Sequence, residues 1–310
     1  MRFLFLLMAC GMLAAAPPPA AHPIQVRIPV WLDPASGDPP AQDFHVTIDG
    51  SAARVTGLQC PDDDLIILLV LDISSGDLTV MDSAKATAEE TIHALPPNVY
   101  VGLLRAQDSL QVLEDPTTDR DTITHRIDEQ TLSGRTGLLA TVDAIGRIAD
   151  AMLEKSATRV AILYVTDGDV RNYREDFVNP VINSSDSHDL SRRFPEALVQ
   201  EKIAKLDSVL AAQQAPLFIV DLNQRTDRLN NAYHNGLKQL AETTGGAVFF
   251  SRFTTEIPEA VRKSFETVRG YYSLTMALPD HAPQRLLIRI TVPENHRVLS
   301  YRARLALHRR

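Results

Sequence analysis

Residues 65–71 read Leu-Ile-Ile-Leu-Leu-Val-Leu, an unbroken apolar run between the acidic residues Asp64 and Asp72, and this run decides the fold. An apolar segment of this length without alternation predicts a strand that is covered on both faces. Such strands belong to parallel sheets that carry helices on either side. The run therefore predicts an α/β domain with this strand in its sheet.

The chain that follows alternates segments of helical and strand periodicity. This alternation predicts a mostly parallel central sheet with helices on both faces. The stretch 171–195 is polar and without pattern, and we expect a surface loop or insertion there. The expected helices are 78–95, 119–129, 137–153, 196–213, 233–243 and 255–269, and the expected strands are 99–104, 110–113, 159–165, 216–220 and 247–250.

Alternation of apolar and polar residues, typical of half-buried strands, appears near the N-terminus in residues 24–30 and 44–48. The second segment ends at Asp49-Gly50, a pair typical of hairpin turns. A segment this short does not enclose a core of its own. We therefore expect residues 22–60 to form a small β module with residues 271–310, which carry further strand patterns at 272–276, 286–292 and 298–307.

The N-terminus has the pattern of a secretory signal peptide: Met1-Arg2, an apolar stretch over residues 3–16, and small residues up to Ala21. We predict residues 1–21 to be removed, which gives a periplasmic or extracellular protein. Two alternatives are a buried N-terminal helix and lipoprotein anchoring through Cys10. No later apolar run approaches the roughly 20 residues that span a bilayer, so no transmembrane helix is expected after signal cleavage.

The composition excludes several classes of protein. Among 310 residues, 45% are hydrophobic and 23% charged, which is not the composition of a disordered chain. Lys and Arg number 31 against 39 Asp and Glu, a formal net charge of −8, so a basic footprint for nucleic acid is missing. The C-terminus carries basic residues, which we interpret as a solvated end, with contact to an anionic envelope surface as the alternative: Arg302, Arg304, His308, Arg309 and Arg310.

Common catalytic and cofactor motifs are absent from the sequence. It contains no GxGxxG or GxxxxGK[ST] loop for nucleotides, no GxSxG elbow, no HExxH helix and no CxxC pair. The nine histidines are scattered, without zinc-ligand spacing. After signal cleavage Cys60 is the single cysteine, so no internal disulfide is expected and we interpret Cys60 as structural. We therefore do not expect an enzyme.

Oxygen-bearing side chains follow the apolar strands at three places. Asp72 and Ser74 follow the first strand, Thr136 follows a Ser-Gly-Arg turn before a helix, and Asp167 follows the strand at 159–165. Ligands of open α/β sheets gather at the carboxyl ends of the strands. Carboxylates and hydroxyls together are the ligand set of Mg²⁺ or Mn²⁺. The competing interpretation is that these residues only cap helices and form turns.

These motifs resemble the metal-ion-dependent adhesion site of von Willebrand factor type A (vWA) domains, a family with a Rossmann-like fold. The resemblance includes strand-D-x-S, SGRTGLLATVDAI at residues 133–145, strand-T-D-G, and LAETTGG at residues 240–246. With RGYYSLTM near the C-terminus, the chain is similar to the bacterial exported VWFA-related family of the acidobacterial type. The implied organisation is a signal peptide (1–21), an N-terminal β segment (22–60), a vWA-like domain (61–270) and a C-terminal β segment (271–310).

The resemblance implies that Asp72, Ser74, Thr136 and Asp167 are the metal ligands, with an open position filled by a carboxylate of a protein partner. The sequence departs from the family pattern at Gly76, where a second serine is expected, and this removes a hydroxyl ligand. Ser75 and Asp77 are candidate substitutes. The metal site is therefore expected to be degenerate.

The expected function is an exported, non-enzymatic protein-interaction or adhesion module that binds its partner at the carboxyl ends of the strands, with Mg²⁺ or Mn²⁺ as the cofactor. An alternative is a metal-independent structural subunit of a cell-envelope assembly. A metal-dependent hydrolase is a third alternative, which the sequence disfavours because no general base or nucleophile–base pair accompanies the site.

Overall fold

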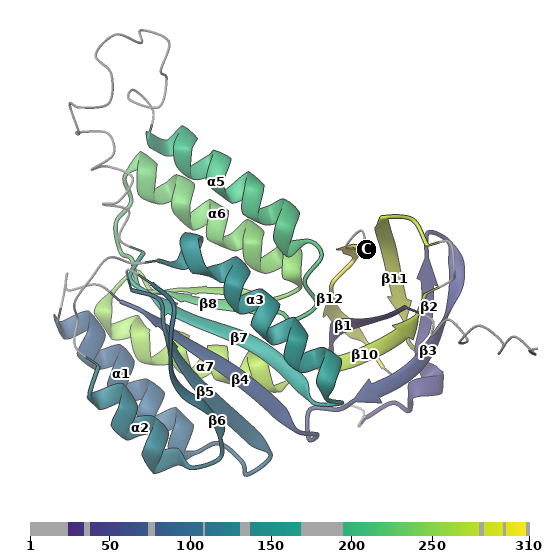
Figure 1. The fold of residues 1–310 in the computed structure, drawn as a ribbon, viewed down its shortest axis with the longest axis horizontal. Coiled ribbons are helices and arrows are strands. Elements are labelled where there is room, and N and C mark those ends of the chain that lie inside the picture. The colour runs from purple at the N-terminus through teal and green to yellow at the C-terminus, as the bar shows by residue number, and fades with distance from the viewer. Residues whose placement is uncertain are drawn as a thin grey trace, which may run out of the picture.

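A computed structural model of the chain describes residues 24–33, 38–73, 78–107, 109–130, 137–168, 195–278, 282–293 and 296–307. Two sheets organise these residues: a six-stranded sheet between helices, and a seven-stranded antiparallel sheet beside it (Figure 1). The expected architecture is confirmed, since a mostly parallel sheet has helices on both faces and a β module is built from both ends of the chain.

The six-stranded sheet has the order β6-β5-β4-β7-β8-β9, with β4 paired in parallel to β5 and β7. The apolar run at 65–71 is β4, one of its two central strands. The chain proceeds outward from β4 in one direction and from β7 in the other, so the order reverses between these two strands. The strands are β4 (Leu65–Asp72), β5 (Val99–Arg105), β6 (Gln111–Thr117), β7 (Arg159–Thr166), β8 (Leu217–Asp221) and β9 (Val248–Phe250).

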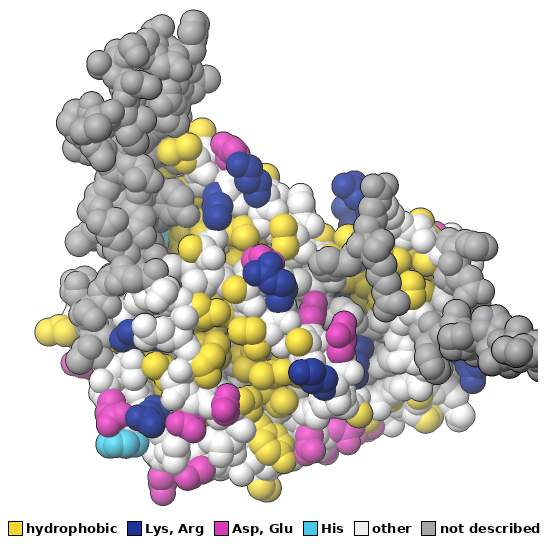
Figure 2. Space-filling view, in the orientation of Figure 1, with side chains coloured by type: hydrophobic (Ala, Val, Ile, Leu, Met, Phe, Trp, Pro, Cys, Tyr) yellow, Lys and Arg dark blue, Asp and Glu magenta, His cyan; other side chains and the backbone are white. Residues whose placement is uncertain are grey.

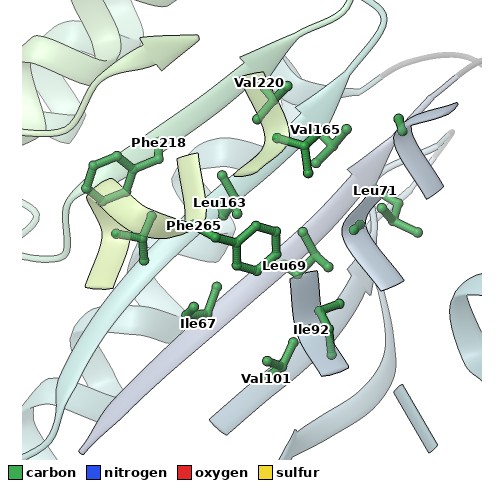
Figure 3. Close-up of a cluster of buried hydrophobic side chains, with 14 of the residues drawn as sticks. Ile67, Leu69, Leu71, Ile92, Val101, Leu163, Val165, Phe218, Val220 and Phe265 are labelled. Carbon is green, nitrogen blue, oxygen red and sulfur yellow. The ribbon is translucent and has the colours of Figure 1, made fainter. Parts of the chain in front are cut away.

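Among the described residues, three helices cover each face of this sheet. The helices α1 (Leu78–His93), α2 (Arg120–Asp128) and α7 (Ile257–Arg269) share one apolar cluster with the strands, and α3 (Leu138–Lys155), α5 (Pro195–Leu210) and α6 (Arg228–Thr244) share the other. Successive side chains of β4 alternate between the two clusters. Figure 3 shows the first cluster, in which Ile67 and Leu69 lie near Phe265 of α7.

The strand β6 differs from expectation. The sequence predicts a short segment at 110–113, whereas the structure has a seven-residue antiparallel strand at the edge of the sheet. Its side chains are exposed or half-buried, and they include Glu114, Asp115 and Pro116. Polar residues and proline are usual on edge strands because they discourage pairing with another chain. The same residues remove the apolar pattern by which a strand is predicted.

The seven-stranded sheet joins the two ends of the chain, because β1 pairs with β10 and β2 pairs with β11. Its order is β12-β1-β10-β3-β2-β11-β13, and the outermost strands β12 and β13 are separated by two residues only. The sheet therefore curls into a half-barrel around apolar side chains such as Ile28, Leu274 and Ile288. The strands are β1 (Gln25–Leu32), β2 (His45–Ile48), β3 (Ser51–Gln59), β10 (Tyr272–Ala277), β11 (Arg285–Thr291), β12 (Val298–Tyr301) and β13 (Arg304–Ala306).

The hairpin predicted at Asp49-Gly50 is confirmed. These two residues connect β2 to β3 with φ angles of 50° and 82°. Positive φ at both central positions is the geometry of a type I′ turn, which Asp and Gly tolerate better than other residues. Two short 3-10 helices complete the described elements, η2 (Ala41–Asp43) and η4 (Thr254–Glu256).

Arg302 corrects the expectation that the basic C-terminal residues form a solvated end. Its side chain is 2% exposed and donates to the carbonyls of Ala211 at 2.7 Å, Leu210 at 3.2 Å and Gln213, at the end of α5. The carbonyls at a helix C-terminus attract cations. Burial lowers the pKa of Arg302 to about 10. The prediction for Arg302 is therefore wrong; His308, Arg309 and Arg310 lie outside the described residues.

Two further arginines bind the half-barrel to the α/β domain. Arg27 of β1 donates to the carbonyls of Ser156 at 2.6 Å and Thr158 at 3.1 Å, just beyond the end of α3. Arg159 is fully buried at the start of β7 and lies 5.3 Å from the ring of Tyr271. It donates to the carbonyls on both connections between the two sheets, at Pro61, Asp63, Arg269 and Tyr271. The half-barrel is thus fixed to the amino-terminal edge of the parallel sheet.

Candidate functional site

The carboxyl ends of three neighbouring strands bring polar side chains together. Asp72 ends β4, Thr166 ends β7 and Asp221 ends β8, and the three residues are register neighbours across the sheet. Asp167 follows Thr166, and its backbone N–H donates to the carbonyl of Asp72 at 3.3 Å. The cluster lies where the strand order reverses, the usual ligand position in open α/β sheets.

Of the residues predicted to hold a metal, the structure describes Asp72 and Asp167 and places them next to each other. The remaining positions lie outside the described residues: Ser74, Ser75, Gly76, Asp77 and Thr136. The assignment of these side chains as ligands stays a prediction.

Asp72 is fully buried, and three donors bind its carboxylate. The oxygen Oδ1 accepts from the backbone N–H of Gly137 at 2.6 Å; Oδ2 accepts from the N–H of Leu138 at 3.1 Å and the hydroxyl of Thr166 at 2.9 Å. The two N–H groups lie at the N-terminus of α3, where the helix dipole favours a negative charge. Asp72 therefore attaches the start of α3 to β4 and β7.

Burial raises the pKa of Asp72 to about 7, and the nearby charge of Asp167 acts in the same direction. The hydrogen bonds from Gly137, Thr166 and Leu138 oppose this shift because they stabilise the carboxylate. The carboxyl groups of the fully buried Asp72 and the half-buried Asp167 thus lie close enough to repel each other. A cation held between them would offset their repulsion.

Gly137 permits this close approach. A Cβ atom at this position would lie 2.2 Å from the carbonyl oxygen of Ala106, at the end of β5. Glycine alone therefore lets the start of α3 pack against β5 while its N–H reaches Asp72.

Gln107 follows Ala106 and is 4% exposed. Its Nε2 donates to the carbonyl of Ile73, the residue after Asp72. Its Oε1 is buried and has no hydrogen-bond partner in the described part of the chain. The sequence analysis does not identify Gln107. The signal that could have identified it is a polar residue just beyond the apolar strand at 99–104.

Asp221 was also missed, although it follows the apolar segment Leu217–Val220 just as Asp72 follows residues 65–71. It is fully buried; Oδ1 accepts from the N–H of Asn223 at 3.0 Å, and Oδ2 lies 3.5 Å from Nε2 of His234. Burial raises the pKa of Asp221 to about 7, assisted by the charge of Asp167, and burial lowers the pKa of His234. No sequence pattern indicated His234, because its partner is distant along the chain.

Asparagine side chains fix the turn that carries Asp167. The Nδ2 group of Asn223 donates to the carbonyl of Gly168 at 3.1 Å and to Oδ1 of Asn230 at 2.7 Å. Gly168 has a φ angle of +57°, and a Cβ atom there would lie 3.1 Å from the ring of Tyr233. The glycine of the T-D-G motif is thus required by both backbone geometry and space.

The described side chains fit a hard divalent cation in their chemistry. An ionised carboxylate has about four acceptor positions, and three donors occupy Asp72, which leaves Oδ1 able to accept once more. Asp72, Asp167 and the orphaned Oε1 of Gln107 offer oxygen alone, the donor that Mg²⁺ and Mn²⁺ prefer. Among the described residues, however, no three His, Cys, Asp or Glu side chains group closely enough to hold a metal ion. A divalent cation at this site would therefore need neutral oxygen ligands in addition to the carboxylates.

The order of the six strands gives the described residues a mostly parallel α/β fold with a switch point between β4 and β7. Comparison with protein-family models finds no match, and neither does comparison with the sequences of curated proteins. Comparison with solved structures finds vWA proteins. The chain is similar to a von Willebrand factor type A protein from Catenulispora acidiphila, with 11% identity and a TM-score of 0.46 over 92% of this chain and 74% of that one.

Two further solved structures illustrate this similarity. One is the vWF domain of the type V pili tip protein Mfa5 from Porphyromonas gingivalis (14% identity, TM-score 0.43, 66% of this chain and 95% of that one). The other is proximal thread matrix protein 1 from the mussel byssus with a zinc-occupied MIDAS motif (11% identity, TM-score 0.44, 71% of this chain and 49% of that one). At such identities and TM-scores these matches carry no information about what this chain binds.

In the part of the chain that the structure describes, no helix is both long enough and apolar enough to cross a bilayer.

Proposed function

We propose that the chain is an exported protein-interaction module of the VWFA-related type, which binds a protein partner at the carboxyl edge of its parallel sheet. The observation that carries this proposal is the juxtaposition of Asp72 and Asp167 at the switch point, with Asp72 joined to the N-terminus of α3. The residues form a rigid, acidic site on a binding edge, and no bond-making step is assigned to them.

The proposed site holds Mg²⁺ or Mn²⁺ through Asp72, Ser74, Thr136 and Asp167, with Gly76 in place of a second serine. When bound, the cation would supply an open coordination position for a carboxylate of the partner. The residues of this chain would fix the ligands, since Asp72 is oriented by the start of α3 and Asp167 by the turn at Gly168.

A protein is a more suitable partner than nucleic acid. The formal net charge of the chain is −8. On the face shown in Figure 2, Lys and Arg side chains lie scattered among Asp and Glu side chains and form no continuous basic surface. Binding to a phosphate backbone depends on such a surface.

A metal-independent structural subunit of a cell-envelope assembly is the second candidate. It is favoured by one observation: three donors from the chain itself already satisfy the buried Asp72, so the edge holds its shape without a cation.

Thermal melting in EDTA and in millimolar Mg²⁺ or Mn²⁺ separates the two candidates. A ligand that binds only the folded state stabilises it by about 2.7 kcal/mol at a hundredfold excess over Kd, a shift of several degrees. We expect such a shift in the native chain and its loss in Asp167→Asn. The matched control is Asp64→Asn, which makes the same change at the exposed, opposite end of β4. A native chain without a metal response would favour the metal-independent subunit.

A further inference from the structure

We infer that Gln107 is an oxygen ligand of the divalent cation, and that its amide oxygen replaces the hydroxyl that the sequence lacks at position 76. This inference rests on the proposed metal site. It adds a ligand from the end of β5, a strand that the D-x-S and T-D-G motifs do not include.

The position of Gln107 is fixed by contacts to the site. The backbone N–H of Ala106 donates to the carbonyl of Leu71 at 2.9 Å, and the Nε2 group of Gln107 donates to the carbonyl of Ile73. The carbonyl of Ala106 lies against Gly137, whose N–H binds Oδ1 of Asp72. The side chain of Gln107 is therefore held at the carbonyl of Ile73, the residue after Asp72, while the backbone of Ala106 contacts Leu71 and lies against the start of α3.

The two ends of its amide group differ in a way that favours a ligand. The nitrogen is hydrogen-bonded, whereas Oε1 is buried without a hydrogen-bond partner in the described residues, in a side chain that is 4% exposed. Buried acceptors without a partner are uncommon in folded proteins, because losing water without replacement is unfavourable. A cation beside Asp72 would satisfy this oxygen.

The chemistry of an amide oxygen also suits the site. Amide oxygens of Asn and Gln are ordinary ligands of hard cations. Asp72 and Asp167 already bring two carboxylates, so a neutral ligand completes the shell without adding a third negative charge to a buried site.

The test is a titration of the full chain with Mn²⁺, followed by electron paramagnetic resonance of free Mn²⁺ and by the melting temperature. We expect Gln107→Leu to raise the Kd for Mn²⁺ by about tenfold or more. We expect Gln107→Glu to bind Mn²⁺ more tightly than Gln107→Leu does, because it keeps an oxygen at this position. If the side chain of Gln107 has only a structural role, Gln107→Glu should weaken Mn²⁺ binding as much as Gln107→Leu does, because both variants lose the N–H donor to the carbonyl of Ile73.

Gln59→Leu is the matched control. Gln59 also donates through Nε2 to a backbone carbonyl, that of Ala157, and has a buried Oε1 without a partner in the described residues, but it lies in β3 of the half-barrel. We expect no change in its Kd for Mn²⁺. Equal Kd values for the native chain and Gln107→Leu would overturn the inference about Gln107 but not the proposed metal site. Equal losses of Mn²⁺ affinity in Gln107→Leu and Gln107→Glu would do the same. A native chain that binds no Mn²⁺ would overturn the proposed metal site and the inference with it.

Discussion

Two buried acidic residues at the carboxyl edge of the parallel sheet differ in how many hydrogen-bond donors stabilise their carboxylates. Asp72 and Asp221 are both fully buried acids, yet three donors bind the carboxylate of Asp72, whereas a single backbone N–H and a histidine face Asp221. Burial raises the pKa of both residues to about 7. Their ionised forms therefore cost stability that a buried apolar residue would not.

This gives a prediction for Asp221→Asn in EDTA. The pKa of Asp221 in the folded chain is about 7, above the value of about 3.9 for an unfolded chain. Its contribution to stability is thus fully present below pH 4 and is lost as the pH rises towards and through 7. Because asparagine does not ionise, the free energy of unfolding of the variant relative to the native chain should rise between pH 4.5 and 7.5. Urea melts at several pH values measure this difference, and a flat difference would contradict the raised pKa.

A second prediction at this scale concerns Gly137→Ala. The added Cβ would lie 2.2 Å from the carbonyl oxygen of Ala106, so either α3 or the end of β5 must move. We expect a loss of about 1–3 kcal/mol in the free energy of unfolding. Gly57→Ala is the control, because its Cβ would meet Thr275 at an ordinary distance of 3.5 Å. Equal urea midpoints for the two variants would show that the approach at Gly137 is not tight.

The site was only partly predictable from the sequence. Asp72 and Asp167 follow strands whose apolar runs are unmistakable, and topology alone brings such positions to one edge. Asp221 ends a similar run but belongs to no motif. Gln107 contacts Ile73, and His234 contacts Asp221. Both partners are distant along the chain, so no local pattern of residues predicts these contacts.

At the scale of elements, the sequence predicts buried strands and amphipathic helices better than edge strands. A strand covered on both faces must be apolar throughout, so β4 and β7 are recognisable. The edge strand β6 has polar residues and a proline instead. The pattern at 298–307 predicts one strand, whereas the structure has β12 and β13 on either side of Arg302 and Ala303. This break allows Arg302 to leave the half-barrel and bind the end of α5.

Arg302→Leu tests this contact between elements. The variant removes the donors to the carbonyls of Leu210, Ala211 and Gln213 and leaves these groups buried, so we expect a loss of about 2 kcal/mol or more in the free energy of unfolding. The same change at the exposed neighbour, Arg304→Leu, should stay within about 0.5 kcal/mol of the native chain. Urea denaturation measures both, and similar small effects would mean that Arg302 contributes little.

At the scale of the whole molecule, two sheets with separate apolar interiors share a contact at the amino-terminal edge of the parallel sheet. Arg27, Arg159 and Arg302 each bind backbone carbonyls across it. Both connections between the sheets, near residues 60–64 and 269–272, pass Arg159. The half-barrel is thus fixed at the end of the parallel sheet opposite to the proposed binding edge.

The domain organisation predicts that residues 61–270 alone are less stable than residues 22–310. The fragment lacks Arg27 and Arg302, and it leaves Arg159 beside cut ends. We expect a lower melting temperature for the fragment and a single cooperative transition for the longer chain. A fragment that melts at the same temperature would show that the half-barrel adds nothing to the α/β domain.

The pairing of β1 with β10 and β12 has a consequence for synthesis. β1 is synthesised well before β10 and β12, the two strands with which it pairs. Until then Ile28 and Val30, which are fully buried in the finished protein, have no sheet to cover them. An unpaired apolar strand of this kind attracts other chains. A nascent chain therefore carries this apolar strand unpaired throughout the synthesis of the parallel sheet, and the half-barrel closes only after β10 and β12 have been made.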